Sequence, residues 1–104
     1  MNDIIFAENG FDRISSLSQQ YDKIFVLTDS RIDGIYSSML ANLFPFTTFK
    51  IVIPEGEQNK NIETVTYIWE RLIEYQAGRD SLMINLGGGT VSDIGAFAAS
   101  TFKA

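Results

Sequence analysis

The chain has 104 residues, a formal net charge of −5, and neither histidine nor cysteine. This length fits one domain or part of one. The eight Lys and Arg residues are scattered, which argues against a nucleic-acid or anionic-membrane surface, and no apolar segment approaches the roughly 20 residues of a membrane span. Without histidine and cysteine, the chain lacks the commonest general base, the commonest zinc ligand and all thiolate chemistry. We expect a cytoplasmic protein.

Strand-like and helix-like patterns alternate in the first half of the chain. The elements predicted there are, in order, a short strand at Ile4–Phe6, a weak helix through Ile14 and Leu17, a strand at Lys23–Thr28 and a helix over about Ile35–Leu43. The last of these helices stops before Pro45, because proline cannot continue a helix.

The second half continues the alternation. A strand is predicted at Thr47–Ile53, and the clearest helix runs from about Asn61 to Gln76. Asn61 is suited to cap its start and Gly78 to take its C′ position. The helix shows an apolar stripe at spacings of three and four, formed by Ile62, Val65, Ile68, Trp69, Leu72 and Ile73 and ending at Gln76. A strand at Leu82–Leu86 and a helix at Val91–Phe102 complete an α/β pattern with a parallel sheet.

The glycines Gly87–Gly89 connect the apolar run Leu82–Leu86 to the last helix. Glycine lets the backbone turn sharply and approach a ligand closely. The following helix presents free N–H groups and its positive dipole end, which favour a phosphate. However, Ser92 stands where a full G-x-G-x-x-G would have its third glycine. The loop therefore predicts either a nucleotide-phosphate site or a tight turn whose glycines only relieve strain.

Polar or glycine-rich residues follow three of the predicted strands: Asp29, Glu55–Lys60 and Gly87–Asp93. Parallel strands place these residues at one edge of the sheet, where such folds bind ligands. An acidic residue there accepts hydrogen bonds from a ribose and repels a 2′-phosphate, which favours NAD over NADP, and Lys60 can neutralise a phosphate or polarise a carbonyl. Structural roles are equally open: Asp29 as a helix cap, Glu57 as a partner of the next helix dipole, and Lys60 as a solvated charge.

Two motifs in this order and spacing resemble the N-terminal half of the 3-dehydroquinate synthase family. The first is G-E-x-x-K at Gly56–Lys60, and the second is the long glycine motif at Leu86–Phe102, with Arg79-Asp80 between them. Thr28-Asp29-Ser30-Arg31 partly matches the family's T-D-x-N. The resemblance spans about Lys23–Phe102.

The resemblance implies a Rossmann-like fold and a defined reaction. The family converts 3-deoxy-arabino-heptulosonate 7-phosphate to 3-dehydroquinate and phosphate in the shikimate pathway of aromatic amino-acid biosynthesis. Bound NAD oxidises a ring hydroxyl and is regenerated, so that the overall reaction is that of a carbon–oxygen lyase. A divalent metal, usually zinc, acts as a Lewis acid. Family members are usually homodimers that act on a small sugar phosphate, without nucleic acid or membrane partners.

By position, the resemblance also implies roles for individual residues. Asp29 would hold the adenosine ribose, and Glu57 and Lys60 would contact the cofactor. Gly88, Gly89 and Thr90 would wrap the pyrophosphate. Asp93 would complete the loop at the start of the helix. No catalytic residue and no metal ligand is expected in this chain, because the family holds its metal with one glutamate and two histidines of a second, helical domain.

We therefore expect residues 1–104 to be an NAD-binding α/β domain, cut in or just after the helix that follows the glycine loop, with the metal and substrate domain absent. Such a fragment would be inactive and would bind NAD weakly. The chain departs from the family pattern at Arg31, Ser92, Ala96 and Ala104, of which Ser92 and Ala96 each replace a glycine.

Two alternatives remain. The first is an NAD-binding fragment of an iron-dependent alcohol or glycerol dehydrogenase, or of a sugar-phosphate cyclase. Against a dehydrogenase stand the G-E-x-x-K motif and Phe97-Ala98-Ala99. The second is a non-catalytic, flavodoxin-like binding module. It ranks last because Asp93 follows a glycine loop instead of joining further clustered acids.

Overall fold

The computed structural model describes residues 3–6, 21–35 and 48–102. Four strands form one sheet in the order β1-β4-β2-β3, and every neighbouring pair is parallel. These strands are β1 (Asp3–Phe6), β2 (Lys23–Asp29), β3 (Thr48–Ile53) and β4 (Ser81–Leu86). The predicted parallel α/β fold and all four predicted strands are thus confirmed.

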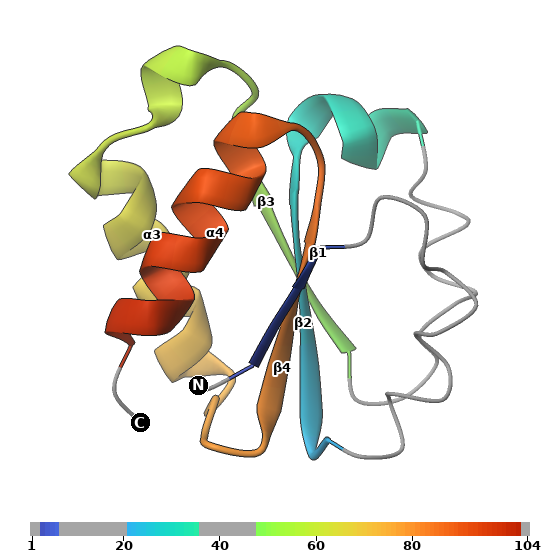
Figure 1. Ribbon diagram of the computed structural model, residues 1–104, viewed down its shortest axis with the longest axis vertical. Helices are drawn as coiled ribbons and strands as arrows, with labels where there is room; N and C mark the ends of the chain where they lie inside the picture. Colours follow the sequence, from blue (N-terminus) through green and yellow to red (C-terminus); the bar gives the residue numbers. More distant parts are fainter. Residues whose placement is uncertain (1–2, 7–20, 36–47, 103–104) are drawn as a thin grey trace.

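Two long helices lie on the same face of the sheet, as Figure 1 shows. They are α3 (Ile62–Glu74) and α4 (Gly89–Thr101), and a short 3₁₀ turn, η2 (Glu57–Asn59), precedes α3. Residues 30–35 are also helical. This helix was predicted to begin about five residues later. It starts directly after β2 because the carboxylate of Asp29 accepts the N–H of Ile32 at 2.8 Å, which satisfies one of the free N–H groups of the first turn. The rest of that prediction, and the weak helix through Ile14 and Leu17, lie outside the described residues.

The core fills the space between the sheet and the two helices. Its fully buried members come from β2, β3, β4, α3 and α4, and include Phe25, Leu27, Ile51, Ile53, Ile68, Leu72, Met83 and Ala98. On the opposite face of the sheet, Ile24 and Val26 of β2 and Leu82 and Ile84 of β4 are also buried. Burial on both faces is typical of central parallel strands and explains their continuous apolar sequence.

The start of α3 follows the prediction, because Asn61 Oδ1 accepts the N–H of Thr64 at 2.9 Å. The predicted end is wrong: Gln76, and not Gly78, occupies the left-handed C′ position, with φ of 58°. Its N–H donates to Ile73 O, and the N–H of Ala77 donates to Leu72 O. This Schellman pairing satisfies the last carbonyls of the helix and buries Ala77 against the core, which outweighs the preference for glycine.

The apolar stripe of α3 is narrower than predicted. Val65, Ile68 and Leu72 are buried, whereas Ile62 is 58% and Ile73 66% exposed. Trp69 is half-buried and its Nε1 donates to Ala98 O at 3.1 Å, which joins α3 to α4. Only the residues facing the sheet and α4 can be buried by a single layer of helices, so the flanks of the stripe remain in solvent.

Candidate functional site

The carboxyl ends of β2 and β3 are tied together at one edge of the sheet. The N–H of Glu55, just after β3, donates to Ser30 Oγ at 3.2 Å. Asp29, the last residue of β2, is half-buried and caps the helix at residues 30–35 through its Oδ1. The structure therefore shows the capping role of Asp29, one of the two roles that the sequence left open.

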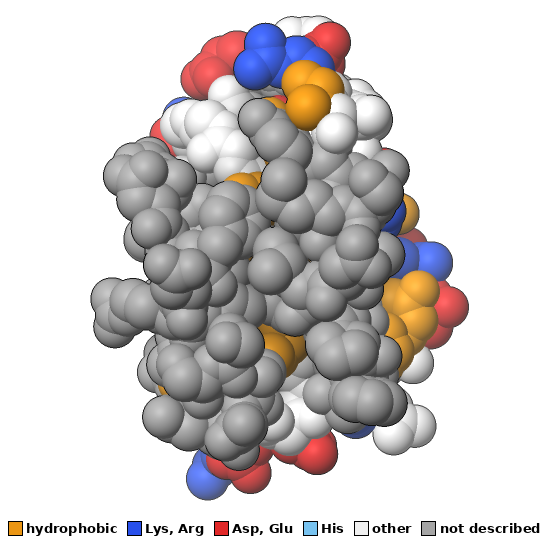
Figure 2. All heavy atoms as spheres, turned by 90° about the vertical axis from the view of Figure 1, so that its right-hand side faces the viewer, with side chains coloured by type: hydrophobic (Ala, Val, Ile, Leu, Met, Phe, Trp, Pro, Cys, Tyr) orange, Lys and Arg blue, Asp and Glu red, His pale blue; other side chains and the backbone are white. Residues whose placement is uncertain are grey.

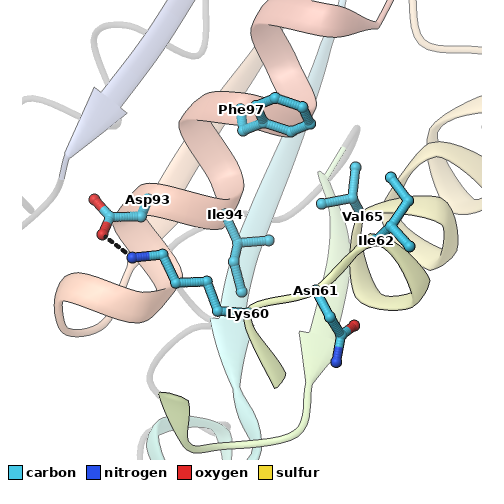
Figure 3. Close-up of a pocket in the computed structure, with 7 residues that line it drawn as sticks. All are labelled: Lys60, Asn61, Ile62, Val65, Asp93, Ile94 and Phe97. Carbon is cyan, nitrogen blue, oxygen red and sulfur yellow. Dashed lines mark hydrogen bonds and ion pairs between the residues drawn. The ribbon is translucent and has the colours of Figure 1, made fainter. Parts of the chain in front are cut away.

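A second set of contacts joins the segment after β3 to the start of α4. Thr90 Oγ1 donates to Glu57 Oε2 at 2.5 Å, and Lys60 Nζ donates to Asp93 Oδ2 at 2.9 Å. Lys60 Nζ also lies 3.6 Å from Glu57 Oε1. Figure 3 shows Lys60 reaching from the loop before α3 to Asp93 on α4. We refer to Glu57, Lys60, Thr90 and Asp93 as the polar clasp.

The polar clasp changes the proton affinity of two of its members. The hydrogen bond from Thr90 and the positive charge of Lys60 lower the pKa of Glu57 below its ordinary value of 4.5. The hydrogen bond to Asp93 and its negative charge raise the pKa of Lys60 above 10.5, and the charge of Glu57 adds to this. Both side chains are solvent-exposed, so each contact is weak by itself, and all four groups remain accessible to a ligand.

The three glycines of the loop have different structural roles. Gly87 has a φ of 157°, and a Cβ there would lie 2.8 Å from Val91 Cγ2, so the fold itself requires glycine. A Cβ on Gly88 or Gly89 would meet no atom within 4 Å. Gly88 is the N-cap of α4 and offers no side-chain cap to the free N–H groups of the first turn. The second and third glycines therefore leave open space in front of a helix N-terminus.

A shallow groove of about 380 Å³ adjoins the polar clasp between α3 and α4. Its lining is mostly apolar, and Figure 3 shows the side chains that form it. They are Ile62 and Val65 of α3, Ile94 and Phe97 of α4, and Lys60, Asn61 and Asp93 at one end. Phe97 is 51% exposed, so the groove gives the clasp an apolar flank that is open to solvent.

The charges at this edge are mixed. Figure 2 shows the side of the molecule away from α3 and α4, where the basic side chains at the top lie between acidic ones. In the part of the chain that the structure describes, no three acidic, histidine or cysteine side chains are grouped to hold a metal ion. None of the described helices is long and apolar enough to cross a membrane.

Of the predicted site residues, the structure brings Glu57, Lys60, Thr90 and Asp93 into direct contact, and Gly88 and Gly89 begin the same helix. Asp29 is linked to this group only indirectly, through the neighbouring Ser30 and the segment after β3.

Sequence reasoning missed two residues at this edge. Ser30 was given no role of its own, although its place directly after a strand, at the edge where such folds bind ligands, was the signal that could have identified it. Asn85 was included in an apolar run, yet it is a polar residue that is only 2% exposed. A polar residue inside an otherwise apolar strand was the signal that could have identified it. Asn85 lies against α4 at Gly95, where a Cβ would lie 2.1 Å from Asn85 Oδ1.

Residues 50–104 match the sequence profile described as 3-dehydroquinate synthase N-terminal. The chain is 43% identical to the 3-dehydroquinate synthase of Clostridium acetobutylicum over 94% of its own length and 30% of that protein. It is 42% identical to the 3-dehydroquinate synthase of Pyrococcus furiosus over 98% of its length and 31% of that protein. The chain thus spans about 30% of the length of these relatives.

Solved structures show the same fold. A 2-deoxy-scyllo-inosose synthase complexed with carbaglucose-6-phosphate, NAD+ and Co2+ superimposes with a TM-score of 0.77 at 23% identity, over 95% of this chain and 29% of that one. The 2-epi-5-epi-valiolone synthase of Streptomyces hygroscopicus, with NAD+ and Zn2+ bound, superimposes with a TM-score of 0.75 at 20% identity, over 98% of this chain and 29% of that one.

Proposed function

Because the chain belongs to the 3-dehydroquinate synthase family, we propose that it is the cofactor-binding part of an enzyme that converts 3-deoxy-arabino-heptulosonate 7-phosphate to 3-dehydroquinate and phosphate. Its role in that enzyme would be to hold NAD at the carboxyl edge of the sheet. When bound, NAD would supply reversible hydride transfer at a ring hydroxyl of the substrate.

The observation that carries this proposal is the open space at Gly88 and Gly89. The fold places no atom where their side chains would be, so the protein itself gives no steric reason for glycine at either position. A pyrophosphate lying against the backbone supplies one, because it can approach the free N–H groups at the start of α4 only where no Cβ intervenes. The residues present therefore fit a dinucleotide.

The polar clasp would complete the binding site. The Thr90 hydroxyl would donate to a phosphate oxygen, and the Lys60 ammonium would provide a positive charge beside it. Both groups are already positioned by Glu57 and Asp93. The carboxylate of Glu57 can accept a hydrogen bond from a ribose hydroxyl or a carboxamide. Asp29 would accept from the adenosine ribose and disfavour a 2′-phosphate. Binding would exchange contacts within the clasp for contacts to the ligand.

A divalent metal does not fit the described residues, since they contain no group of three potential ligands and the chain has no histidine. We infer that the metal, zinc in our proposal, and the substrate phosphate are held by a further domain, and that residues 1–104 alone do not turn over substrate. We further propose a cytoplasmic enzyme of aromatic amino-acid biosynthesis that forms a homodimer and has no nucleic acid or membrane partner.

The test is an NMR titration of the ¹⁵N-labelled chain, separately with NAD, NADP and FMN. The chemical shifts of the backbone amides are measured at each ligand concentration. We expect NAD to shift the amides of Gly87–Asp93, Asp29 and Lys60, and NADP to shift them less. The amides at the far end of α4, near Thr101, serve as an internal control. A chain whose loop amides do not move at millimolar NAD would contradict the proposal. A stronger response to FMN would favour a flavodoxin-like module.

A further inference from the structure

Asn85 is a buried polar side chain without a partner, next to the proposed cofactor site. It is 2% exposed, and neither its Oδ1 nor its Nδ2 has a hydrogen-bond partner within the described structure. It is the fifth residue of β4, aligned with Leu27 of β2, and precedes Gly87 by two positions. A buried amide without partners costs free energy, so the presence of asparagine here is not explained by stability.

The amide of Asn85 packs directly against the backbone of α4 at Gly95. A Cβ on Gly95 would lie 2.1 Å from Asn85 Oδ1, 2.5 Å from Cγ and 2.7 Å from Nδ2. All three amide atoms thus lie around the position that a side chain would occupy. The strand and the helix approach each other here as closely as glycine permits.

We propose that Asn85 is a positioning residue. Its planar amide, packed on Gly95, sets how deeply α4 lies on the sheet and thereby where the N–H groups of Gly88–Thr90 stand. The proposal rests on the proposed function, in which these N–H groups hold the pyrophosphate of NAD. Gly95 lies less than two helical turns from Gly89, so a displacement at Gly95 is carried along a stiff helix to the loop. At Gly87 a Cβ would likewise meet Val91 of α4, so the first turn of α4 also lies close to the end of β4.

The shape of the amide is what distinguishes this role from simple core packing. Asparagine and leucine have the same number of side-chain heavy atoms, but the amide is flat whereas the leucine branch is tetrahedral and thicker. Asn85→Leu removes the two unpaired polar atoms and therefore relieves their burial cost. It also places methyl groups against Gly95. If the contact between residue 85 and Gly95 did not set the position of α4, Asn85→Leu would leave the loop in place.

Four variants test the proposal: Asn85→Leu, Gly95→Ala, Asn85→Ala, and the double variant that combines Asn85→Ala with Gly95→Ala. Gly34→Ala is the matched control, because a Cβ on Gly34 meets no atom within 4 Å. The amide shifts of Gly87–Asp93 are measured first without ligand, and the NAD dissociation constant second. We expect Asn85→Leu and Gly95→Ala to displace the loop amides and to raise the dissociation constant on the order of tenfold. In the double variant, the loop amide shifts and the NAD dissociation constant should both return to the values found for Asn85→Ala. Gly34→Ala should change neither the shifts nor the dissociation constant.

The proposal would be overturned if the loop amide shifts did not change in Gly95→Ala or in Asn85→Leu. It would also be overturned if these shifts changed as much in the double variant as in Gly95→Ala. Should Gly95→Ala fail to fold, the double variant decides: recovery of the folded state supports the contact, and continued unfolding overturns it. If the loop amides respond as expected but neither the wild-type chain nor the variants bind NAD, the proposed function fails while Asn85 is still shown to position the loop.

Discussion

The two ends of the sheet are built in opposite ways. At the amino end, the rings of Phe25, Phe49 and Tyr75 stack in series, with centroids 5.3 Å and 4.4 Å apart. Lys23 Nζ also donates to Gln76 O at 2.9 Å there. At the carboxyl end, the contacts are made by exposed polar side chains of the clasp, and two glycines leave open space. The amino end stabilises the fold, and the carboxyl end keeps its polar groups available for a ligand.

This contrast predicts which property each substitution changes. Changes at the amino end should lower the free energy of unfolding and leave NAD binding by folded molecules intact. Changes at the carboxyl end should weaken NAD binding and leave stability nearly unchanged. Gly87 and Gly95 are exceptions, because a side chain at either position would collide with its neighbours in the fold.

The largest effect is expected for Phe25→Ala. The ring of Phe25 is fully buried and stacks on Phe49, so its removal leaves a cavity and should lower the free energy of unfolding by about 3–5 kcal/mol. Urea denaturation measures the loss, with Phe25→Leu as a control that retains most of the volume and should lose less. A loss below about 1 kcal/mol would show that the amino end does not stabilise the fold as proposed.

Gly87→Ala and Gly89→Ala separate the two roles of the glycine loop. Gly87→Ala should cost about 1–3 kcal/mol of stability, because its φ is strained for alanine and its Cβ would meet Val91. Gly89→Ala should change stability by less than about 0.5 kcal/mol and weaken NAD binding on the order of tenfold. Urea denaturation and an NAD titration of both variants make the comparison. Equal losses of stability and of NAD affinity in the two variants would contradict the assignment of Gly87 to the fold and of Gly89 to NAD binding.

The sequence predicted the sheet and its edge better than the details of packing. The strands were predictable because β2 and β4 are buried on both faces, which requires apolar residues without interruption. The placement of Glu55–Lys60 and Gly87–Asp93 at one edge followed from the rule that parallel strands end at one edge, whereas the contact of Lys60 with Asp93 was not predicted. The end of α3 at Gln76 was not predictable, because the pairing of Ala77 with Leu72 depends on tertiary packing. The contact of Asn85 with Gly95 was missed because these residues meet only when the helix is laid on the sheet.

A smaller and more selective effect is expected for Lys60→Gln. Lys60 and Lys50 have similar side-chain exposure, 44% and 40%, and each forms an ion pair with an aspartate. Only Lys60 belongs to the polar clasp. Lys60→Gln should therefore weaken NAD binding on the order of tenfold, whereas Lys50→Gln, which breaks the pair with Asp33, should leave it unchanged. Isothermal titration calorimetry with NAD measures both. Similar losses in the two variants would indicate a general charge effect instead of a local contact.

The smallest effect is the pH dependence of the clasp itself. The pKa of Glu57 lies below 4.5, because Thr90 donates to its carboxylate and Lys60 lies beside it. The stability that Glu57 contributes is therefore present above pH 4.5 and is lost as the pH falls through its lowered pKa. Lys60 behaves in the opposite sense. Its pKa is raised above 10.5 by Asp93 and Glu57, so its contribution is complete below pH 10.5 and is lost as the pH rises through the raised value.

A ¹³C NMR titration of the Glu57 carboxyl carbon in Thr90→Val tests the assignment. Valine preserves the shape of threonine but cannot donate, so the pKa of Glu57 should rise toward 4.5 while its pairing with Lys60 keeps part of the shift. Thr66→Val is the control, because the Thr66 hydroxyl donates within α3 to Ile62 O. If the pKa of Glu57 does not change in Thr90→Val, the Thr90 contact is not formed in solution. In that case the two sides of the clasp are joined only by Lys60, and the start of α4 is held less firmly than the amino end of the sheet.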